Sequence, residues 1–447
     1  MFQDKGFYKQ LIKLALPLIF QQLLKVSVNA IDSIMLGRID QFQMSAVSQA
    51  NQAFFIYYCI CCALSIGASV LVSQYWGKKD IETIRTINAY GIRTIVFFGT
   101  CVTILIYLFP QTFMSLYSSD TQIVALGSSY LRKVCLMYPL CGISVMIIFL
   151  CRGVEKVEIV LFANIVSYST NILLDYLLIY GKLDFPAMGI DGVAIGTVIA
   201  RSVELFICAS YFLRSKDIYF EIPDLLRTDP AIKNSLIRTT LPILGHELLW
   251  SLGTSSGSLI LGQLGRDSVA GYNVTSVMYD LFASIGNGLS GAVSVIIAML
   301  LGKGEIDTAI DRSRKILRLA LCIGITLGIL TFLCKDMFIG LYSLNEQSRI
   351  YARQFLTVIS CIWPFSLMEM VTMVGILRAG GDGKVGFYTD MVAMWMICIP
   401  LASLFAFRLH AQPVIVVAII KNIIVLEAIS GVFRVYTNRW ARNLTRD

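Results

Sequence analysis

The sequence predicts an all-α integral membrane protein with twelve transmembrane helices in two six-helix lobes, related by a pseudo-twofold axis along the membrane normal. Three observations lead to this fold class. First, 56% of the 447 residues are hydrophobic and 15% are charged, and the mean hydropathy is +0.72. Second, twelve apolar runs are each long enough to cross a hydrocarbon layer of roughly 30 Å. Third, the first half of the chain is repeated in the second half.

The apolar runs stand out in a window of about 20 residues. Six runs fall in each half of the chain, so both halves enter the membrane from the same side and form a parallel repeat. The predicted spans lie near residues 10–37, 46–76, 84–109, 121–150, 158–180, 190–213, 234–263, 270–301, 309–333, 347–376, 385–408 and 412–436.

The repeat has one constant offset, without a gap, over the first third of each half. IMLGRID at 34–40 lies over LILGQLG at 259–265. A parallel repeat of apolar spans is typical of transporters that place a site between two halves. We therefore expect an N-lobe at 1–213, a cytoplasmic linker at 214–233 and a C-lobe at 234–447. The matched pairs are Pro17 with Pro242, Gly37 with Gly262, Gly77 with Gly302, Lys78 with Lys303 and Tyr117 with Tyr342.

The net charge of +8 does not indicate nucleic-acid binding, because the basic residues follow the positive-inside rule. With the N-terminus in the cytoplasm, 24 of the 37 Lys and Arg adjoin inner segments and 5 lie in outer loops. We expect a multi-pass protein of the cell membrane with both termini in the cytoplasm and the lipid bilayer as its main partner. A cleft inside one chain requires no second copy, so function as a monomer is expected.

The first span carries charged and polar residues on one face. Gln21, Lys25 and Asp32 are spaced four and seven residues apart, and Asn29 flanks this stripe. An ionised side chain at the bilayer centre costs at least about 2.5 kcal/mol, so such residues usually face the protein interior and have a function. Alternatively, Asp32 reaches the outer surface or pairs with Lys25.

The fifth span has a second polar face, formed by Asn164, Tyr168, Asn171 and Asp175. Their spacing of four, seven and eleven residues places them on one side of a helix. Carboxylate and amide oxygens are hard ligands that suit a proton or a small cation and suit zinc poorly.

The sixth span adds Thr197, Arg201 and Glu204, also on one face. The hydroxyl of Thr197 extends the same set of hard ligands. Two alternatives stay open: Asn171 and Thr197 form an interhelical hydrogen bond without an ion, and Arg201 simply pairs with Glu204.

The second half departs from the first at these positions. Asp32 falls on Gly257 and Asp175 falls on about Leu401, so the acidic pocket is not duplicated. His246 is able to carry a proton near neutral pH, although it is also compatible with a packing role. The intramembrane acids of the second half include Glu247, Asp280, Glu369 and Asp390, of which Asp390 is expected to be structural. As substrate contacts we expect Gln21, Lys25, Asn29, Tyr168, Glu247, Asp280 and Glu369.

Five segments together resemble the multidrug and toxic compound extrusion (MATE) family, within the multidrug/oligosaccharidyl-lipid/polysaccharide flippase superfamily. The resemblance covers essentially the whole chain, and an Arg-Gly turn after the fourth span of each half supports it. The segments are ALPLIFQQLL (15–24), NAIDSIMLG (29–37), SVLVSQYWGKKD (69–80), NILLDYLLIYG (171–181) and GVAIGT (192–197).

The resemblance implies an exporter that exchanges organic, mostly cationic compounds for Na⁺ or H⁺ by alternating access. It also implies a cation- or proton-coupling site, including possible Na⁺ ligands, at Asp32, Asn171, Asp175 and Thr197. Some family members use second-lobe acids instead. Glu247 and Glu369 are offset from that pattern, so their role stays open.

The sequence favours a transporter over an enzyme. It has no G-x-x-x-x-G-K-[ST] loop for a nucleotide and no Asp-rich loop for Mg²⁺, so we expect no cofactor apart from the coupling ion. A lipid-linked oligosaccharide or cell-wall precursor flippase is the alternative, because it shares the two-lobe plan. Its substrate is anionic, whereas the deep charges here are mostly acidic, which favours small organic cations.

Overall fold

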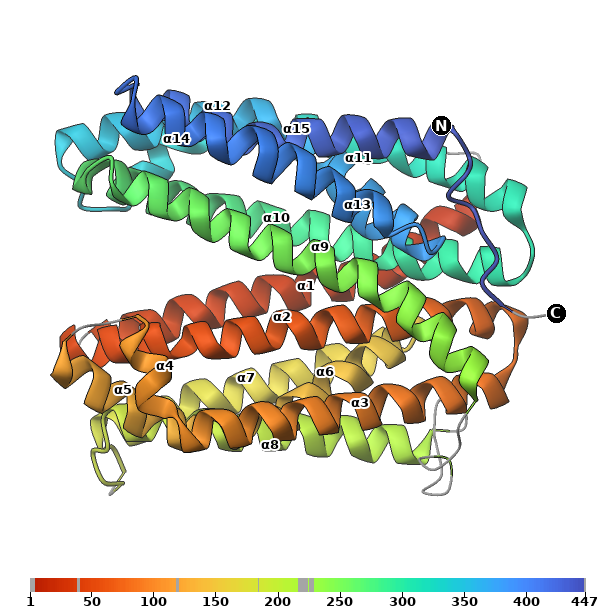
Figure 1. Cartoon of the computed structure of the whole chain (residues 1–447), viewed down its shortest axis with the longest axis horizontal. Helices are drawn as coiled ribbons and strands as arrows, with labels where there is room; N and C mark the ends of the chain where they lie inside the picture. Colours follow the sequence, from red (N-terminus) through yellow and green to blue (C-terminus); the bar gives the residue numbers. More distant parts are fainter. Residues whose placement is uncertain are drawn as a thin grey trace. The chain divides into compact units, whose positions relative to one another are not determined.

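The chain is all-helical, as predicted. The computed structural model contains no strand within the residues it describes (Figure 1). Several side chains between residues 29 and 44, among them those of Asn29 and Asp32, lie outside this description although their backbone is helical. The described residues are 5–37, 41–117, 120–183, 185–215, 224 and 229–445.

The contacts between residues divide the chain into two compact units. The first unit is Leu23–Ile237, and the second unit combines Met1–Gln22 with Arg238–Asp447. Helix α1 (Lys5–Gly37) therefore contributes to both units. The other helices of the first unit are α2 (Gln41–Lys78), α3 (Ile81–Leu108), α4 (Pro110–Ser115), α5 (Thr121–Val134), α6 (Met137–Gly153), α7 (Val157–Tyr180) and α8 (Ile190–Arg214).

The second unit contains two π-helical segments, η2 and η3, each continuous with α-helical neighbours. These segments have wider turns than an α-helix, a feature often found at functional sites. Helix α9 (Pro230–Gly262) belongs to this unit from Arg238 onward. The other elements are α10 (Arg266–Gly302), α11 (Ile306–Ile339), α12 (Glu346–Glu369), η2 (Met370–Leu377), α13 (Lys384–Thr389), η3 (Asp390–Cys398), α14 (Ile399–Phe407) and α15 (Pro413–Tyr436).

Most of these helices are long and apolar enough to span a membrane. In the described part of the chain ten spans meet that test, and an eleventh does if α5 and α6 form one bent span. The predicted span 234–263 corresponds to α9, which is not among them. Its 33 residues nevertheless give it a length of about 50 Å, enough to cross a bilayer.

The constant offset of the sequence repeat is preserved in the helix boundaries. Helices α3 and α5 begin at residues 81 and 121, and α11 and α12 begin at the matching positions 306 and 346. Pro17 lies inside α1, and Pro242 lies at the matching position inside α9. The repeat seen in the sequence is therefore a repeat of helices.

The two copies differ around a shared proline. In the first unit the chain breaks before Pro139, and α5 and α6 meet at an angle of 53°. The matching Pro364 lies inside α12, which continues directly into η2. Proline removes a backbone donor and crowds the preceding turn, so a helix responds with a kink or a locally altered turn. The first copy therefore has a kink between two helices, and the second copy has a π-helical segment.

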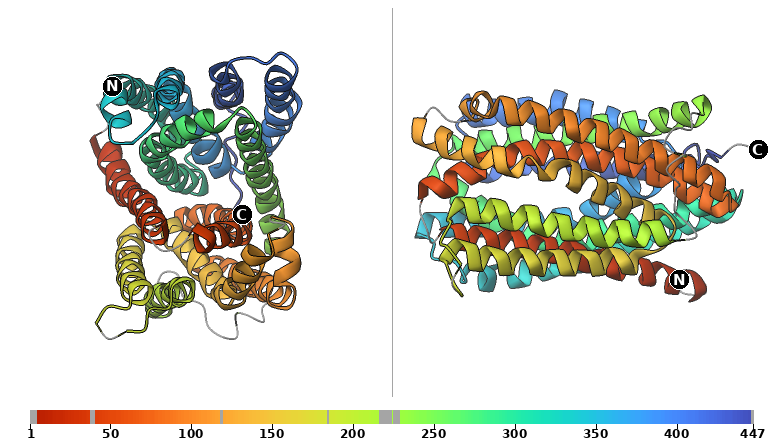
Figure 2. Two further views of the ribbon diagram at one scale, coloured as in Figure 1. Left: turned by 90° about the vertical axis from the view of Figure 1, so that its left-hand side faces the viewer. Right: turned by 90° about the horizontal axis from the view of Figure 1, so that it is seen from below.

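Glycines allow close helix packing inside each unit. Helices α11 and α12 lie side by side, and a Cβ at Gly328 would lie 2.5 Å from the Ser360 carbonyl oxygen. Helices α7 and α8 also lie side by side (Figure 2). Gly192 of α8 packs against the Leu178 backbone. Small residues at such contacts are typical of membrane helices, because dispersion and backbone proximity drive their association.

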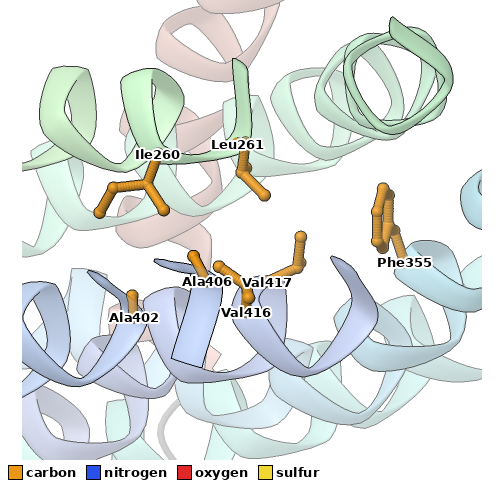
Figure 3. Packing of buried hydrophobic residues seen from close by; sticks show 7 residues of the cluster. All are labelled: Ile260, Leu261, Phe355, Ala402, Ala406, Val416 and Val417. Carbon is orange, nitrogen blue, oxygen red and sulfur yellow. The ribbon is translucent and has the colours of Figure 1, made fainter. Parts of the chain in front are cut away.

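The apolar side chains are divided between buried clusters and exposed faces. In the second unit, one cluster joins α9, α12, α14 and α15 (Figure 3). Phe97 and Phe206 of the first unit and Leu333 and Phe433 of the second are each more than 70% exposed. Large exposed apolar faces of this kind are compatible with contact to lipid. The members of the cluster are Ile260, Leu261, Phe355, Ala402, Ala406, Val416 and Val417.

Candidate functional site

Helix α7 carries a buried carboxylate paired with an amide. Asp175 is 1% exposed and Asn171 is 8% exposed. Asn171 Nδ2 donates a hydrogen bond to Asp175 Oδ2 at 3.2 Å. The residues are four positions apart and thus one turn apart on the same helix face, as the sequence indicates. The pair offers carboxylate and amide oxygens, which suit a proton or a small cation.

Helix α8 approaches this pair at Gly196, which the sequence-based prediction did not single out. A Cβ at Gly196 would collide with Asp175 Oδ1, so glycine is what lets the α8 backbone lie against the carboxylate. The adjacent Thr197 donates its hydroxyl proton to the Val193 carbonyl oxygen at 2.8 Å. The structure therefore places Thr197 on the helix that packs on Asp175, with its hydroxyl bonded inside α8.

The side chains of Asp32 and Asn29 lie outside the described residues, so their predicted roles stay predictions. Their backbone belongs to α1. Tyr180 Oη donates a hydrogen bond to the Met35 carbonyl oxygen at 3.0 Å. This contact joins the end of α7 to α1 within one turn of the Asp32 backbone.

Lys25 has an aromatic partner. Its Nζ atom lies 4.4 Å from the centre of the Tyr58 ring and 3.4 Å from Tyr58 Oη. A cation over a tyrosine ring is stabilised by the ring's negative face. Gln21, predicted on the same stripe, is buried at 8% exposure and belongs to the second unit. The predicted stripe thus crosses the boundary between the two units within α1.

Tyr168 is buried, and the guanidinium carbon of Arg201 lies 5.9 Å from the centre of its ring. Arg201 Nη1 is 2.5 Å from Glu204 Oε2, and the Glu204 side chain is 2% exposed. The structure therefore confirms the alternative that Arg201 and Glu204 pair with each other. The two charges of this pair compensate each other, and the carboxylate of Glu204 is buried.

In the second unit, Glu247 forms an ion pair that the sequence did not predict. Arg378 Nη2 lies 2.8 Å from Glu247 Oε1, and the two side chains are 3% and 22% exposed. Glu369 is half-buried and lies within Coulombic range of both residues. The negative charge of Glu247 is thus compensated by an arginine of the same unit, which weakens the case for its predicted contact with a cationic substrate.

Asp280, another predicted substrate contact, is exposed on α10. It interacts electrostatically with Lys421 of α15, whose Nζ lies 4.5 Å from the centre of the Tyr279 ring. Each unit therefore has a lysine over a tyrosine ring, Lys25 over Tyr58 and Lys421 over Tyr279.

Three further residues form what we call the second-unit acid cluster: His246, Asp390 and Glu427. They are 6%, 0% and 2% exposed. His246 Nδ1 lies 2.7 Å from Asp390 Oδ2. Glu427 was not predicted, although a single acid inside the apolar run 412–436 was a visible signal. Within the described residues, no group of three or more His, Cys, Asp or Glu side chains is arranged to hold a metal ion.

The helical repeat and the buried acids define a multi-pass membrane transporter of two similar halves. The profile of the MatE family matches residues 17–177 and 242–404, which together exceed half of the chain. The two matches begin at Pro17 and Pro242, the pair of prolines that the repeat aligns. The chain belongs to the MATE family of membrane transporters.

The curated relatives match over most of their length. The chain is 25% identical over 403 residues to a probable multidrug resistance protein NorM of Thermotoga maritima, covering 88% of this chain and 84% of the relative. It is 25% identical over 419 residues to a probable NorM of Agrobacterium fabrum, covering 90% and 88%. The crystal structure of the Vibrio cholerae MATE transporter VcmN in the bent form has a TM-score of 0.87 and 18% identity, covering 99% of this chain and all of that one. This last likeness concerns the fold alone.

Proposed function

We propose that the chain is a secondary active multidrug efflux antiporter that exports organic, mostly cationic compounds in exchange for Na⁺ or H⁺. Membership of the MATE family and the multidrug resistance names of the NorM relatives support export of drugs. The observation that carries the ion coupling is the buried Asn171–Asp175 pair on α7. Asp175 is 1% exposed, and an ionised carboxylate buried in a membrane helix is energetically costly. Residues of this kind usually have a function.

The proposed mechanism follows from charge. An inward-moving ion binds at Asp175, with Asn171, Thr197 and Asp32 as the other ligands. Binding neutralises the carboxylate and removes the cost of keeping it ionised in the membrane. The ion shifts the equilibrium toward whichever conformation binds it more tightly, by an amount set by the difference in affinity. The gradient is the energy source, since the sequence contains no nucleotide-binding loop.

The arrangement in the cell follows from the distribution of basic residues. We place both termini in the cytoplasm and the protein in the cell membrane, because 24 Lys and Arg adjoin one side and 5 the other. The two lobes, 1–213 and 234–447, would alternate around a substrate site, and one chain suffices for this. The alternative function is that of a lipid-linked sugar flippase, and a test of substrates must distinguish it from drug efflux.

The test is efflux of a fluorescent organic cation from cells expressing the wild type, Asp32→Asn or Asp175→Asn. The matched control is Asp336→Asn, whose carboxylate is 57% exposed and pairs with Arg353 at the surface. We expect each membrane variant to lose at least about tenfold in efflux rate, within the usual range of coupling energies. The control should behave as the wild type at equal abundance.

Undiminished efflux by Asp32→Asn or Asp175→Asn would overturn the assignment of the ion site. Transport of an anionic lipid-linked sugar, with no transport of organic cations, would instead replace the efflux function with the flippase.

A further inference from the structure

The C-terminal tail is fixed against one end of the second unit. Helix α15 ends at Tyr436, and two residues later Asn438 has a left-handed backbone conformation, with a φ of 59°. Trp440 is fully buried, and its Nε1 donates a hydrogen bond to the Val435 carbonyl oxygen at 3.1 Å. A Cβ at Gly380 would collide with the Trp440 carbonyl oxygen, so the tail lies directly on this glycine. The first residues of the tail are therefore held in a defined position.

This position brings the tail beside helix α11. Arg314 Nη2 donates a hydrogen bond to Asn438 Oδ1 at 3.3 Å. The guanidinium carbon of Arg314 lies 5.5 Å from the centre of the Tyr436 ring. Arg318 is exposed one turn further along α11, and the exposed Arg439 directly follows Asn438. Three arginines are thus gathered where the end of α15 meets α11, and we call Arg314, Arg318 and Arg439 the arginine cluster.

The acids near the arginine cluster pair with other cations. Asp311 lies three residues before Arg314, but its Oδ2 is 2.7 Å from Lys315 Nζ. Asp382 lies in the turn against which the tail packs, and its Oδ2 is 2.6 Å from Arg434 Nε. Within the described residues, no member of the arginine cluster forms an ion pair with an acid. The cluster therefore has a net positive charge and attracts an anion.

Helix α11 continues from the arginine cluster as an exposed apolar face. Leu321, Ile325 and Ile329 are 39%, 46% and 55% exposed. They lie seven, eleven and fifteen residues after Arg314, which places them on the helix face that carries Arg314 and Arg318. From Arg318 to Ile329 the helix rises about 17 Å, which is about half of a hydrocarbon layer of roughly 30 Å. The apolar face is therefore as long as one leaflet is thick, with arginines at its end.

Helix α15 has a similar face at its C-terminal end. Ile429, Phe433 and Tyr436 are 58%, 72% and 52% exposed, and their spacing of four and seven residues places them on one side of the helix. Tyr436 is the residue whose ring lies beside the Arg314 guanidinium. Tyrosine is enriched at the depth of lipid headgroups, because its ring is apolar and its hydroxyl is polar. Both helices thus offer apolar side chains to acyl chains and a polar end to a headgroup.

We propose that the arginine cluster binds the headgroup of an anionic phospholipid, whose acyl chains lie along the exposed faces of α11 and α15. A guanidinium presents several N–H donors in one plane and binds phosphate oxygens in pairs. Basic residues at the ends of membrane helices attract anionic headgroups. A soluble phosphate would contact the arginines but would leave both apolar faces uncovered. Lipid binding does not depend on drug efflux, and only its assignment to the cytoplasmic leaflet rests on the orientation proposed above.

The lipid site is tested by native mass spectrometry of the purified full-length protein in detergent micelles. The protein is titrated with phosphatidylglycerol or with phosphatidylcholine of the same acyl chains. We expect the wild type to bind phosphatidylglycerol at least about tenfold more tightly, because only this lipid has a net negative charge. R314Q/R318Q/R439Q should bind it about a hundredfold more weakly than the wild type, since each arginine near a headgroup contributes about fivefold to the affinity.

The matched control is R266Q/R349Q/R408Q, which also removes three exposed arginines of the second unit. These arginines lie at the opposite end of its helices, in the first turns of α10 and α12 and directly after α14. The control should bind phosphatidylglycerol as the wild type does. Glycerol phosphate, which has the anionic group without acyl chains, should not displace the lipid at equal concentration. Equal helical content by circular dichroism shows that each variant is folded.

Equal affinity of the wild type for the two lipids would overturn the site, and so would equal losses in the two triple variants. Displacement of the lipid by glycerol phosphate would replace it with a soluble anion and would also overturn the proposal. Because the measurement needs no transport, failure of the efflux test leaves the lipid site standing, and failure of the lipid test leaves the efflux proposal standing.

Discussion

The two units surround a buried aspartate with different partners. In the first unit, Asp175 receives a hydrogen bond from Asn171, one turn away on the same helix. In the second unit, Asp390 lies beside a residue of another helix, with 2.7 Å between Asp390 Oδ2 and His246 Nδ1. Both occur on a scaffold whose helix starts repeat with a constant offset along the chain. The comparison teaches that duplication preserved helix boundaries while the polar chemistry diverged.

The largest expected loss of stability follows from breaking the ion pair between Arg378 and Glu247 of the second unit. Glu247→Gln leaves Arg378, which is 2% exposed, without its carboxylate. Removing one partner of such a buried pair costs on the order of 3 kcal/mol of unfolding free energy, because the remaining charge stays desolvated. Reversible unfolding of the purified protein in mild detergent would measure this loss.

The control is the exposed pair Arg353–Asp336, whose side chains are 54% and 57% exposed. Asp336→Asn should cost less than about 1 kcal/mol, since water screens surface pairs. Equal losses for Glu247→Gln and Asp336→Asn would show that the second unit does not depend on its buried pair.

A smaller effect is expected where both copies depend on close helix packing. Gly328→Ala places a Cβ 2.5 Å from the Ser360 carbonyl oxygen, so α11 and α12 must move apart. Such overpacking costs about 1–3 kcal/mol. Gly192→Ala in the first unit meets the Leu178 carbonyl oxygen at 2.8 Å and should behave alike.

Gly6 is the matched control for these glycines, because a Cβ there meets nothing within 4 Å. Gly6→Ala should be neutral or stabilising by up to about 1 kcal/mol, since alanine favours a helix. Thermal unfolding of the three variants side by side provides the measurement. A loss for Gly6→Ala as large as that for Gly328→Ala would mean that packing is not the cause.

The smallest expected change in stability concerns the N-terminal caps of two matching helices, α3 and α11. Asp80 caps α3 by accepting a hydrogen bond from the Thr83 backbone N–H at 3.0 Å. Its counterpart in the second copy, Glu305, caps α11 without a side-chain hydrogen bond. Asp80→Ala should cost about 1 kcal/mol and Glu305→Ala clearly less. Chemical denaturation curves would compare them, and equal costs would show that the cap of α3 adds nothing.

Much of the fold was predictable because it depends on local patterns. Apolar runs and the constant offset indicated the helices and their duplication, since both are written directly in the chain. The Asn171–Asp175 contact was predictable for the same reason, because residues four apart on a helix must be neighbours. The outcome is different for Pro139 and Pro364: their positions repeat, but whether a helix kinks or continues depends on its packing.

The second-unit contacts were not predictable from spacing. Arg378 and Glu247 are 131 positions apart, and only the packed helices bring them together. Asp390 was expected to be structural. Glu427 was not predicted to matter, because a single acid in an apolar run does not indicate which residue it contacts. Gly196 was part of a recognised motif, yet its contact with Asp175 requires the distance between α7 and α8.

The most direct test of ion-driven export uses the purified protein in liposomes. Export of a fluorescent organic cation is measured under an imposed Na⁺ gradient and under an imposed pH gradient, for the wild type and for Asp175→Asn. We predict gradient-driven export by the wild type and a loss of at least about tenfold in Asp175→Asn. Undiminished export by Asp175→Asn, or equal wild-type export without any gradient, would contradict ion coupling at the first unit.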